Sequence, residues 1–451
     1  MKLFTRKLLF GLALALNLFC GSIINAQTNL PIQKTYEFSN GNWFDGKSFK
    51  RQTFYSAGGI LTRRKPSKID ESVDLKNGFV IPPFADAHTH NLDGVRDLKR
   101  MSEAYLNEGT FYVQVLGNYA SGAKQARPLL NKPSTLDVSY ANGMLTCTYG
   151  HPFMVYEPLA MGIYNPAEAF QRIAEIKKSR RAENNSYWFL DSKADVDAKW
   201  EKILAAKPDI IKIALLDAEN YEKYVAAGDT LNKGLSPEVA RYIVQKAHQA
   251  GLRVYAHIET ANDFRLGLKI GIDGFAHAPY YQAWDGRIET KPQDDLTLAD
   301  IKLAAKRKVV VIPTAQKGTY AATEKSSDGK ETLNQERLAR ITARHKKLFN
   351  EMNKNGVRLA FGLDNYGTTL IPEILYFHDN KIFDNPTLLK IAVETTPQTI
   401  FPNRKIGKLR DGYEANFLVL NGNPLKDFNQ IKNINLRFKQ GAFINADEKK
   451  P

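Results

Sequence analysis

Between residues 79 and 363, strand-like and helix-like segments alternate, and this alternation limits the possible folds more than any other feature of the sequence. One helix-like segment, 236–250, has Ser236 as its expected N-cap and Gly251 as its stop. Two more span 166–180 and 336–355. Such alternation is typical of a parallel α/β fold. The strand-like runs are 79–85, 110–116, 145–149, 209–214, 253–257, 274–277, 309–314 and 358–363.

Eight strand-and-helix units predict the α/β class and, within it, a (β/α)8 TIM-like barrel. We assign this barrel to residues 81–402. An open, doubly wound sheet is the structural alternative, but it usually has fewer units and a glycine-rich first turn. No GxGxxG motif follows the first strand. The barrel is therefore the expected fold.

The segments that flank the barrel are rich in short strand-like runs. Residues 27–80 carry several, separated by glycine and asparagine turns, and residues 403–451 carry two more. We expect the two segments to combine into a small β-sandwich domain. Residues 326–329, inside the barrel, are predicted to form a polar loop.

Residues 1–26 have the features of a secretory signal peptide. Lys2, Arg6 and Lys7 precede an apolar run at 8–19, which is too short to span a bilayer, and Ala26 offers a small residue for cleavage. The sequence predicts an exported protein, periplasmic or secreted, with no stable membrane anchor after cleavage.

Cysteine usage limits the chemistry of the exported chain. Cys20 raises the alternative of a lipoprotein, but residues 17–19 lack the small side chains expected before a lipidated cysteine. Cleavage after Ala26 leaves Cys147 as the only cysteine. This excludes an internal disulfide and a thiolate metal site.

The chain is strongly basic, with a formal net charge of +15. The lysines and arginines are scattered, without interleaved aromatic residues, and this argues against nucleic-acid binding. Attraction to an acidic surface or substrate is the remaining inference. A homo-oligomer is compatible with the sequence, which carries no interface signal.

Two histidines spaced i, i+2 follow the first strand-like run, in Asp86-Ala87-His88-Thr89-His90. Side chains at this spacing in a strand point to the same side. Two imidazoles on one side can hold one divalent metal ion. The alternative is a pair of ordinary surface histidines. A metal site requires further ligands, and these would have to come from the ends of the other strands.

Polar residues recur where the other strands end, and a barrel places its chemistry at these ends. Lys212 lies inside the apolar fourth run, His257 and His277 end the fifth and sixth, and Asp364 follows the eighth. Each has a structural explanation by itself, as a snorkelling lysine, a core histidine or a capping aspartate. Their joint occurrence favours one shared site. The histidines in helix-like surroundings, which we assign no role, are His248, His345 and His378.

These motifs together resemble the amidohydrolase superfamily and, within it, the imidazolonepropionase-like and prolidase-like metal-dependent hydrolases. The resemblance covers nearly the whole chain after the signal segment. It includes the tail 406–417, which is similar to the family's return to its β-sandwich. The other matching segments are 86–90, 211–213, 247–257, 271–277 and 362–364.

The resemblance implies an enzyme that hydrolyses carbon–nitrogen bonds of a small-molecule substrate with two divalent metal ions. Zinc is the expected metal, with manganese or iron as alternatives. Carboxylation of the bridging lysine would make it an anionic oxygen ligand, and water held between the ions would become hydroxide. The aspartate would pass the proton to the leaving group. The implied ligands are His88, His90 and Asp364 for one ion, His257 and His277 for the other, and Lys212 between them.

Some positions near the strand ends depart from the family pattern. Many relatives carry an aromatic residue soon after the fifth-strand histidine, where this chain has Glu259, which we expect to cap the next helix or else to reach the site. His151 is expected to contact substrate or stabilise an oxyanion, with an ordinary loop histidine as the alternative. Gln316 and Tyr320 are further candidates beyond the seventh strand. The expected catalytic residues are Asp364, Lys212 and His151.

Three other function classes remain open at this point. One is a mononuclear, deaminase-type amidohydrolase in which Lys212 stays an amine. Another is a Schiff-base lyase that uses Lys212, but this leaves the histidines and Asp364 unexplained. The third is a non-catalytic binding protein on the same barrel, which the loss of a ligand would indicate, and no ligand is missing. The apolar surroundings of Lys212 favour carboxylation, because burial keeps more of the amine neutral.

Overall fold

The computed structural model describes residues 34–229, 231, 233–279, 295–325 and 330–444, which lie in one compact unit. The predicted signal segment 1–26 and the predicted polar loop 326–329 lie outside the described residues. No helix in the described part of the chain is both long and apolar enough to cross a membrane.

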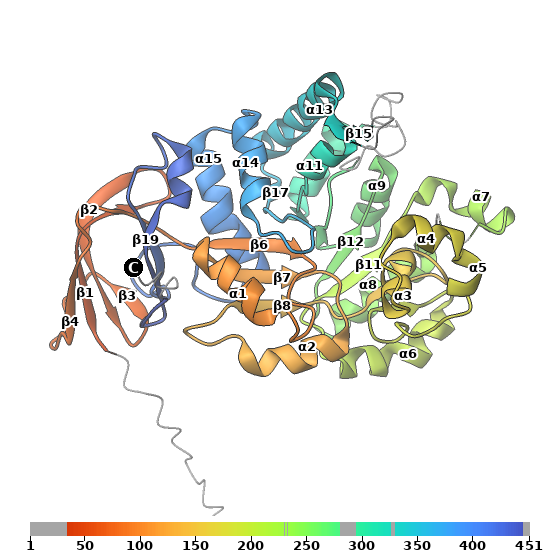
Figure 1. The fold of residues 1–451 in the computed structure, drawn as a ribbon, viewed down its shortest axis with the longest axis horizontal. Helices are drawn as coiled ribbons and strands as arrows, with labels where there is room; N and C mark the ends of the chain where they lie inside the picture. The colour runs from red at the N-terminus through yellow and green to blue at the C-terminus, as the bar shows by residue number, and fades with distance from the viewer. Residues whose placement is uncertain (1–33, 230, 232, 280–294, 326–329, 445–451) are drawn as a thin grey trace, which may run out of the picture. The chain divides into compact units, whose positions relative to one another are not determined.

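Two parallel sheets form the centre of the fold (Figure 1). Backbone hydrogen bonds connect both edges of the smaller sheet to the larger one. On one side Asp209 N donates to Tyr140 O at 2.8 Å, and on the other Ala87 N donates to Phe361 O at 2.8 Å. The arrangement is a TIM-barrel-like α/β fold. The first sheet contains β6 (Phe84–Thr89), β7 (Thr110–Val115) and β8 (Asp137–Tyr140), and the second, in spatial order, β10 (Tyr187–Phe189), β9 (Met144–Thr146), β11 (Ile211–Ala214), β12 (Val254–His257), β13 (Gly274–Phe275), β14 (Val310–Val311) and β17 (Arg358–Leu359).

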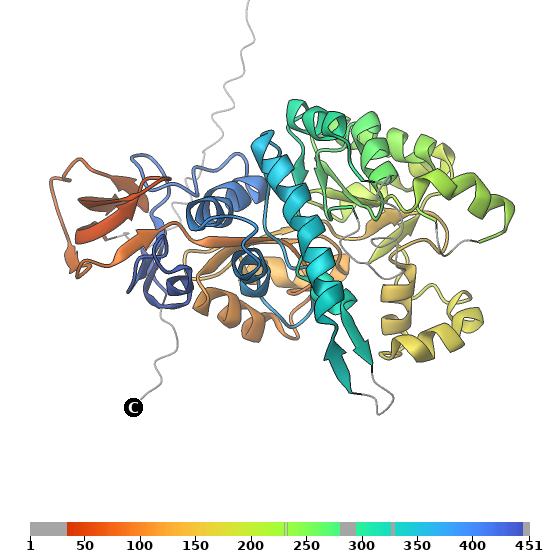
Figure 2. The ribbon, with the colours of Figure 1, turned by 90° about the horizontal axis from the view of Figure 1, so that it is seen from above.

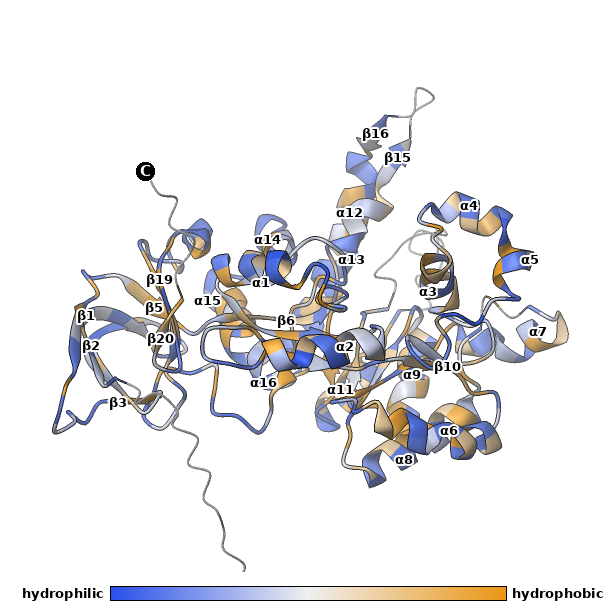
Figure 3. Ribbon diagram, turned by 60° about the horizontal axis from the view of Figure 1, so that its bottom comes forward, coloured by the Kyte–Doolittle hydropathy of each residue, from blue (hydrophilic) through white to orange (hydrophobic). Residues whose placement is uncertain are grey.

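Helices follow most of these strands along the chain. The predicted capping of α8 is present, since the Ser236 side chain accepts a hydrogen bond from Val239 N and Pro237 is the first helical residue. Figure 3 shows both hydrophilic and hydrophobic residues along α8, whose buried members include Ile243 and Val244. The helices are α1 (Leu98–Asn107), α2 (Ala120–Ala126), α3 (Phe153–Ala160), α4 (Pro166–Gln171), α5 (Ile173–Ile176), α6 (Lys193–Ala205), α7 (Tyr221–Ala226), α8 (Pro237–Gln249), α9 (Ala261–Ile270), α11 (Leu298–Lys306), α12 (Lys317–Ala321), α13 (Gln335–Lys354), α14 (Ile371–Asp379), α15 (Asn385–Lys390) and α16 (Thr396–Ile400).

Three expectations need correction. The predicted strand 79–85 divides at Pro82 and Pro83 into β5 (Phe79–Ile81) and β6, because proline cannot donate to a strand ladder. The predicted helix 166–180 divides into α4 and α5, and the apolar side chain of Phe170 in α4 is 64% exposed. Strands β8 and β10 were not predicted, since one alternates polar and apolar residues and the other has only three residues.

The segments from the two ends of the chain share one mixed sheet of eight strands. The predicted β-sandwich is not confirmed, because these strands form a single sheet. β5 joins the two segments, pairing parallel with β1 and antiparallel with β18. The strands are β1 (Tyr36–Phe44), β2 (Phe49–Ala57), β3 (Ile60–Thr62), β4 (Glu71–Asp74), β5, β18 (Asn416–Leu420), β19 (Ile434–Lys439) and β20 (Ala442–Phe443).

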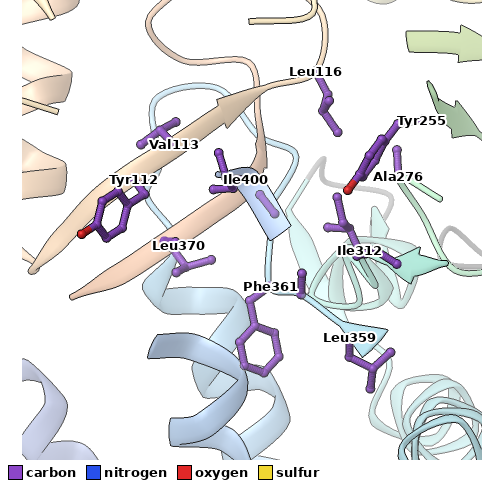
Figure 4. Packing of buried hydrophobic residues seen from close by; sticks show 14 of the residues in the cluster. Tyr112, Val113, Leu116, Tyr255, Ala276, Ile312, Leu359, Phe361, Leu370 and Ile400 are labelled. Atoms are coloured by element: carbon purple, nitrogen blue, oxygen red, sulfur yellow. The ribbon is translucent and has the colours of Figure 1, made fainter. Parts of the chain in front are cut away.

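One large hydrophobic cluster extends through the parallel strands and into the terminal sheet. Figure 4 shows members of this cluster, among them Tyr112 in β7, Tyr255 in β12, and Ile312 and Phe361 just after β14 and β17. The small hairpin of β15 (Thr323–Lys325) and β16 (Glu331–Leu333) lies outside this core, next to the N-terminal end of α13 (Figure 2). The core holds the strands in place, so that their C-terminal ends can present polar side chains at fixed positions.

Candidate metal centre

The polar residues predicted at the strand ends meet around one cavity of about 330 Å³. His88 lies in β6, Lys212 in β11 and His257 at the end of β12, while His277 follows β13 and Asp364 follows β17. The cavity therefore lies at the C-terminal ends of the parallel strands, where a barrel of this type places its chemistry. Its lining is His88, His90, Met144, His151, Val155, Lys212, His257, Glu259, His277, Lys317, Asp364, Asn365 and Tyr366.

Backbone carbonyls orient the first two histidines. His88 Nδ1 lies 2.9 Å from Ala276 O, and His90 Nδ1 lies 3.0 Å from Gly117 O. A carbonyl only accepts hydrogen bonds, so each Nδ1 donates, and Nε2 is the ring nitrogen that each histidine directs toward the cavity. The Nε2 atoms lie 3.2 Å (His88) and 2.9 Å (His90) from Asp364 Oδ1.

These short contacts between imidazole nitrogens and a carboxylate fit a metal ion. Burial lowers the pKa of His88 well below its usual range, so its imidazole is neutral and repels the carboxylate oxygen unless a cation lies between them. Ligand atoms bonded at about 2.0–2.1 Å to one ion stand roughly 3 Å apart, close to the separations here. One donor atom each from His88, His277 and Asp364 lie within 4.8 Å of one another.

His277 and His257 extend the cluster. Thr314 Oγ1 donates to Pro313 O and accepts from His277 Nδ1 at 2.9 Å, which places the lone pair of the neutral His277 imidazole on Nε2. The ring centroids of His257 and His277 are 4.7 Å apart. Burial lowers the pKa of His257 to about 3 and that of His277 well below its usual range. Both imidazoles are therefore neutral, as metal ligation requires.

Lys212 is a buried amine inside this cluster. Its side chain is 1% exposed, and among the described residues its Nζ has no hydrogen-bond partner. Burial lowers its pKa to about 7, against the attraction of Asp364. An appreciable fraction of Lys212 is therefore a neutral, nucleophilic amine at neutral pH.

Asp364 lies at the centre of the polar contacts, with a left-handed backbone (φ 57°) and its N–H donated to His88 O at 2.7 Å. Burial alone raises its pKa, but the positive charge of Lys317 opposes burial, and the pKa lies well below its usual range. Lys317 Nζ lies 3.1 Å from Asp364 Oδ2, the oxygen that does not face the two histidines. The carboxylate is therefore ionised.

Lys317 was not predicted from the sequence. We named Gln316 and Tyr320 beyond the seventh strand, but neither lines the cavity, and Lys317 at the start of α12 does. The Tyr320 hydroxyl instead accepts from Asn365 Nδ2 at 3.3 Å. The position just after the seventh strand could be predicted from the sequence. Whether Gln316 or Lys317 points into the cavity could not, because it depends on the local backbone.

His151 and Glu259 line the cavity next to His257. The ring of His151 stacks on that of His257 with centroids 4.1 Å apart, and burial lowers the pKa of His151 well below its usual range. The expectation that Glu259 caps the next helix is wrong, since the N-cap of α9 is Thr260. Glu259 Oε1 lies 3.8 Å from His257 Nε2.

Two tyrosines that were not predicted pack on His90. The Tyr366 ring stacks on the imidazole with centroids 5.3 Å apart, and the Tyr156 hydroxyl lies 3.3 Å from His90 Nδ1. These contacts fix the orientation of His90, the most exposed of the four histidines predicted as metal ligands. Tyr366 lies in the loop after Asp364, and a loop position of this kind carries no periodic signal.

Residues that were assigned no role lie elsewhere. His345, buried in α13, contacts the Tyr376 hydroxyl at 2.9 Å, and His248 pairs with Asp273 at 2.9 Å. Cys147 is a buried free thiol that donates to Lys233 O at 3.3 Å, and burial raises its pKa to about 11. The last of these residues, His378, lies beside Asp379 at the end of α14.

A protein family and several solved structures are similar to this chain. The model of the amidohydrolase family matches residues 79–443, and the chain belongs to that family. The resemblance predicted from the strand-end motifs is therefore confirmed. The family is metal-dependent, in keeping with the cluster of two histidines and an aspartate.

The individual proteins that this chain resembles have low sequence identity to it. An ochratoxinase from Aspergillus niger is 25% identical over 217 residues, which are 46% of this chain and 41% of that protein. The alignment thus spans about two fifths of the length of this curated relative. The crystal structure of A. niger ochratoxinase superposes with a TM-score of 0.67 at 16% identity, covering 91% of this chain and 95% of that one. A Xaa-Pro dipeptidase with bound methionine superposes with a TM-score of 0.66 at 18% identity, covering 91% and 100%.

Metal addition should stabilise the protein. At a free zinc concentration of about 100 times the dissociation constant, binding to the folded state alone adds roughly 2.7 kcal/mol to the free energy of unfolding. We expect a chelator to lower the melting temperature and zinc to restore it. In His88→Ala the zinc response should disappear, whereas His248→Ala, which removes an exposed histidine, should keep it. A chelator-insensitive melting temperature in the parent protein would contradict the metal centre.

Proposed function

We propose that this protein is an exported metallohydrolase that cleaves the carbon–nitrogen bond of an amide or cyclic amide at a binuclear centre bridged by carboxylated Lys212. The observation that carries the proposal is the convergence of the Nε2 atoms of His88 and His90 on one oxygen of Asp364, next to an amine without a hydrogen-bond partner among the described residues. Such a donor set is suited to divalent metal ions.

The ligands divide naturally into two sets. One ion would be held by His88, His90 and Asp364, and a second by His257 and His277. Neutral Lys212 Nζ attacks carbon dioxide, forms a nitrogen–carbon bond and releases one proton, which turns the amine into a carbamate with two oxygen donors. The pKa of Lys212, lowered to about 7 by burial, supports this step. Such an anion can lie between two dications, whereas an ammonium group cannot.

When bound, the metal ions would activate a water molecule at neutral pH and polarise the substrate carbonyl. Asp364 Oδ2 accepts a proton from the attacking water and delivers it to the leaving nitrogen. Lys317, 3.1 Å from this oxygen, keeps the carboxylate ionised before the reaction. His151, neutral and held against His257, can donate a hydrogen bond to the developing oxyanion.

Amides are the favoured substrates because of the relatives. One of them is an ochratoxinase and another a Xaa-Pro dipeptidase, and both have the fold of this chain. The cavity of about 330 Å³ suits a small molecule. Its wall combines a cation, Lys317, with a carboxylate, Glu259, so a substrate with a polar group at each end is the natural occupant.

Metal content is the decisive measurement for this proposal. The mature protein, produced with added zinc and bicarbonate, should contain about two metal ions per chain, and native mass spectrometry should detect a carbon dioxide adduct. Lys212→Ala should lose both the adduct and about one ion or more. Lys302→Ala, at an exposed position on α11, is the matched control and should lose neither.

The alternatives give different results in the same measurement. One ion per chain that is insensitive to Lys212→Ala would indicate the mononuclear, deaminase-type alternative. Trapping of a substrate on Lys212 by borohydride would indicate a lyase. A protein that binds no metal under any of these conditions would contradict the hydrolase mechanism.

Export rests on the sequence of residues 1–26 and is tested separately. Expressed from its own start codon in a Gram-negative host, the protein should be recovered from the periplasm or the medium with Gln27 at its N-terminus. An intact Met1 in the cytoplasm would contradict export, and a lipid on Cys20 would indicate the lipoprotein alternative.

A further inference from the structure

A second cavity, of about 460 Å³, lies away from the metal centre. Pro82, in its wall, precedes β6 and so lies at the opposite end of that strand from His88 and His90. The turn between β1 and β2 forms one side of the cavity, and residues 390–394 and 408–410 form the other. None of the residues that line this cavity lines the metal centre or has a role in the proposed hydrolysis. The cations that line it are Lys47, Lys50, Arg63, Lys390, Lys408 and Arg410.

Two of these cations already have carboxylate partners. Lys50 pairs with Asp45 at 2.8 Å, and Arg63 pairs with Asp411 at 3.1 Å. Within the described residues, the others make no ion pair within 4.0 Å, and Arg410 donates to the hydroxyl of its neighbour Tyr413 at 2.6 Å. The remaining four cations, Lys47, Lys390, Lys408 and Arg410, face one carboxylate, so the cavity has an excess of three positive charges.

That carboxylate, Glu394, is 8% exposed and lies in the π-helical segment Ile391–Thr395 that lines the cavity. It makes no hydrogen bond to any described residue. Burial raises its pKa, although Lys408 and Lys390 oppose the shift. A buried carboxylate without a hydrogen-bond donor is costly, and π-helical segments of this kind are frequent at functional sites.

Gly46 keeps the carboxylate uncovered. Its φ is +99°, which side chains rarely adopt, and a Cβ atom at this position would lie 2.9 Å from Glu394 Oε1. The turn that carries Gly46 therefore passes over the carboxylate without shielding it. The cavity thus offers several cations for an anion and a single buried acceptor for a hydrogen-bond donor.

We propose that this cavity binds a phosphate ester of a small polyol, with the phosphate at Lys47, Lys390, Lys408 and Arg410 and a hydroxyl donating to Glu394. Several cations together favour a phosphate over a single carboxylate, because a phosphate presents three oxygens to charge-assisted hydrogen bonds. Glu394 repels the phosphate and attracts the hydroxyl, so it orients the ester in one direction. A phosphate ester next to free hydroxyls occurs in glycerol phosphate, a monoester with three free phosphate oxygens, and in a phosphatidylglycerol headgroup, a diester with two.

Calorimetric titration of the mature, metal-loaded protein with sn-glycerol 3-phosphate and with inorganic phosphate tests the site. We expect saturable binding of the ester that weakens with added salt. Lys390→Glu/Lys408→Glu should weaken it about a hundredfold or more, roughly tenfold for each charge-assisted contact. Lys178→Glu/Lys302→Glu makes the same charge change at exposed positions elsewhere and should leave it unchanged. Glu394→Ala should remove the preference for the ester over inorganic phosphate.

Vesicles distinguish the source of the ester. Binding to phosphatidylglycerol vesicles, but not to phosphatidylcholine vesicles, that is lost in Lys390→Glu/Lys408→Glu and kept in the control pair would assign the site to a lipid headgroup. Saturable binding of the soluble ester without vesicle binding would assign it to a free metabolite. Binding of neither, or equal loss in both double variants, would overturn the proposal. Metal content, unchanged in every variant, confirms that the proteins are folded and that the result does not depend on the hydrolase mechanism.

Discussion

Asp364→Asn should lower kcat/KM for amide hydrolysis by about a thousandfold or more, because the variant loses both a proton acceptor and an anionic metal ligand. The amide oxygen of asparagine can still lie near His88 and His90, but it carries no charge and cannot take a proton from water. The loss should therefore fall mainly on kcat. The assay uses whichever N-acyl amino acid or dipeptide the parent enzyme cleaves best.

The matched control for this variant is Asp379→Asn. Asp379 contacts His378 at 2.7 Å, as Asp364 contacts His90 at 2.9 Å, but its side chain is 66% exposed and lies away from the cavity. The control should keep full activity. If Asp364→Asn retained a tenth of the parent kcat with its full metal content, Asp364 would not be the residue that transfers the proton.

The candidate site could be located from the sequence because its signals are local. His88, His257 and His277 each lie within or directly after an apolar strand, and the end of a parallel strand has a fixed position in this fold. The pattern does not show which atoms face one another. The contacts of Asp364 with Lys317, and of His90 with Tyr366, come from loops and from the first turn of a short helix, whose side-chain directions depend on packing.

The terminal sheet was harder to predict for a related reason. Val80 pairs with Val419, and residues so far apart in sequence leave no local periodicity that identifies their partner. The strand character of both segments was evident, but strand propensity alone does not distinguish one eight-stranded sheet from two packed sheets. Only the register of β5, between β1 and β18, decides this.

A buried ion pair fastens the terminal sheet to the parallel strands, and its removal should destabilise the protein strongly. Lys439, in β19, has a fully buried side chain, and its Nζ donates to Asp137 Oδ1 and to the carbonyls of Lys132 and Thr135, each at 2.7 Å. Asp137, the first residue of β8, is also buried and contacts Arg404 at 2.8 Å. In Lys439→Met the buried Asp137 Oδ1 loses its charged donor, and only Arg404, on the other carboxylate oxygen, still faces this aspartate.

We therefore expect Lys439→Met to lower the free energy of unfolding by about 3–5 kcal/mol, the usual cost of breaking a buried pair from one side. The pair of Lys193 and Glu238 has the same length, 2.7 Å, but its side chains are 51% and 73% exposed. Lys193→Met should cost only about 0–1 kcal/mol, because water replaces the lost partner. Urea unfolding followed by circular dichroism measures both, with equal m-values as the check that the unfolded states are comparable. Equal losses in the two variants would mean that Lys439 contributes no more than a surface contact, and that apolar packing alone holds the terminal sheet in place.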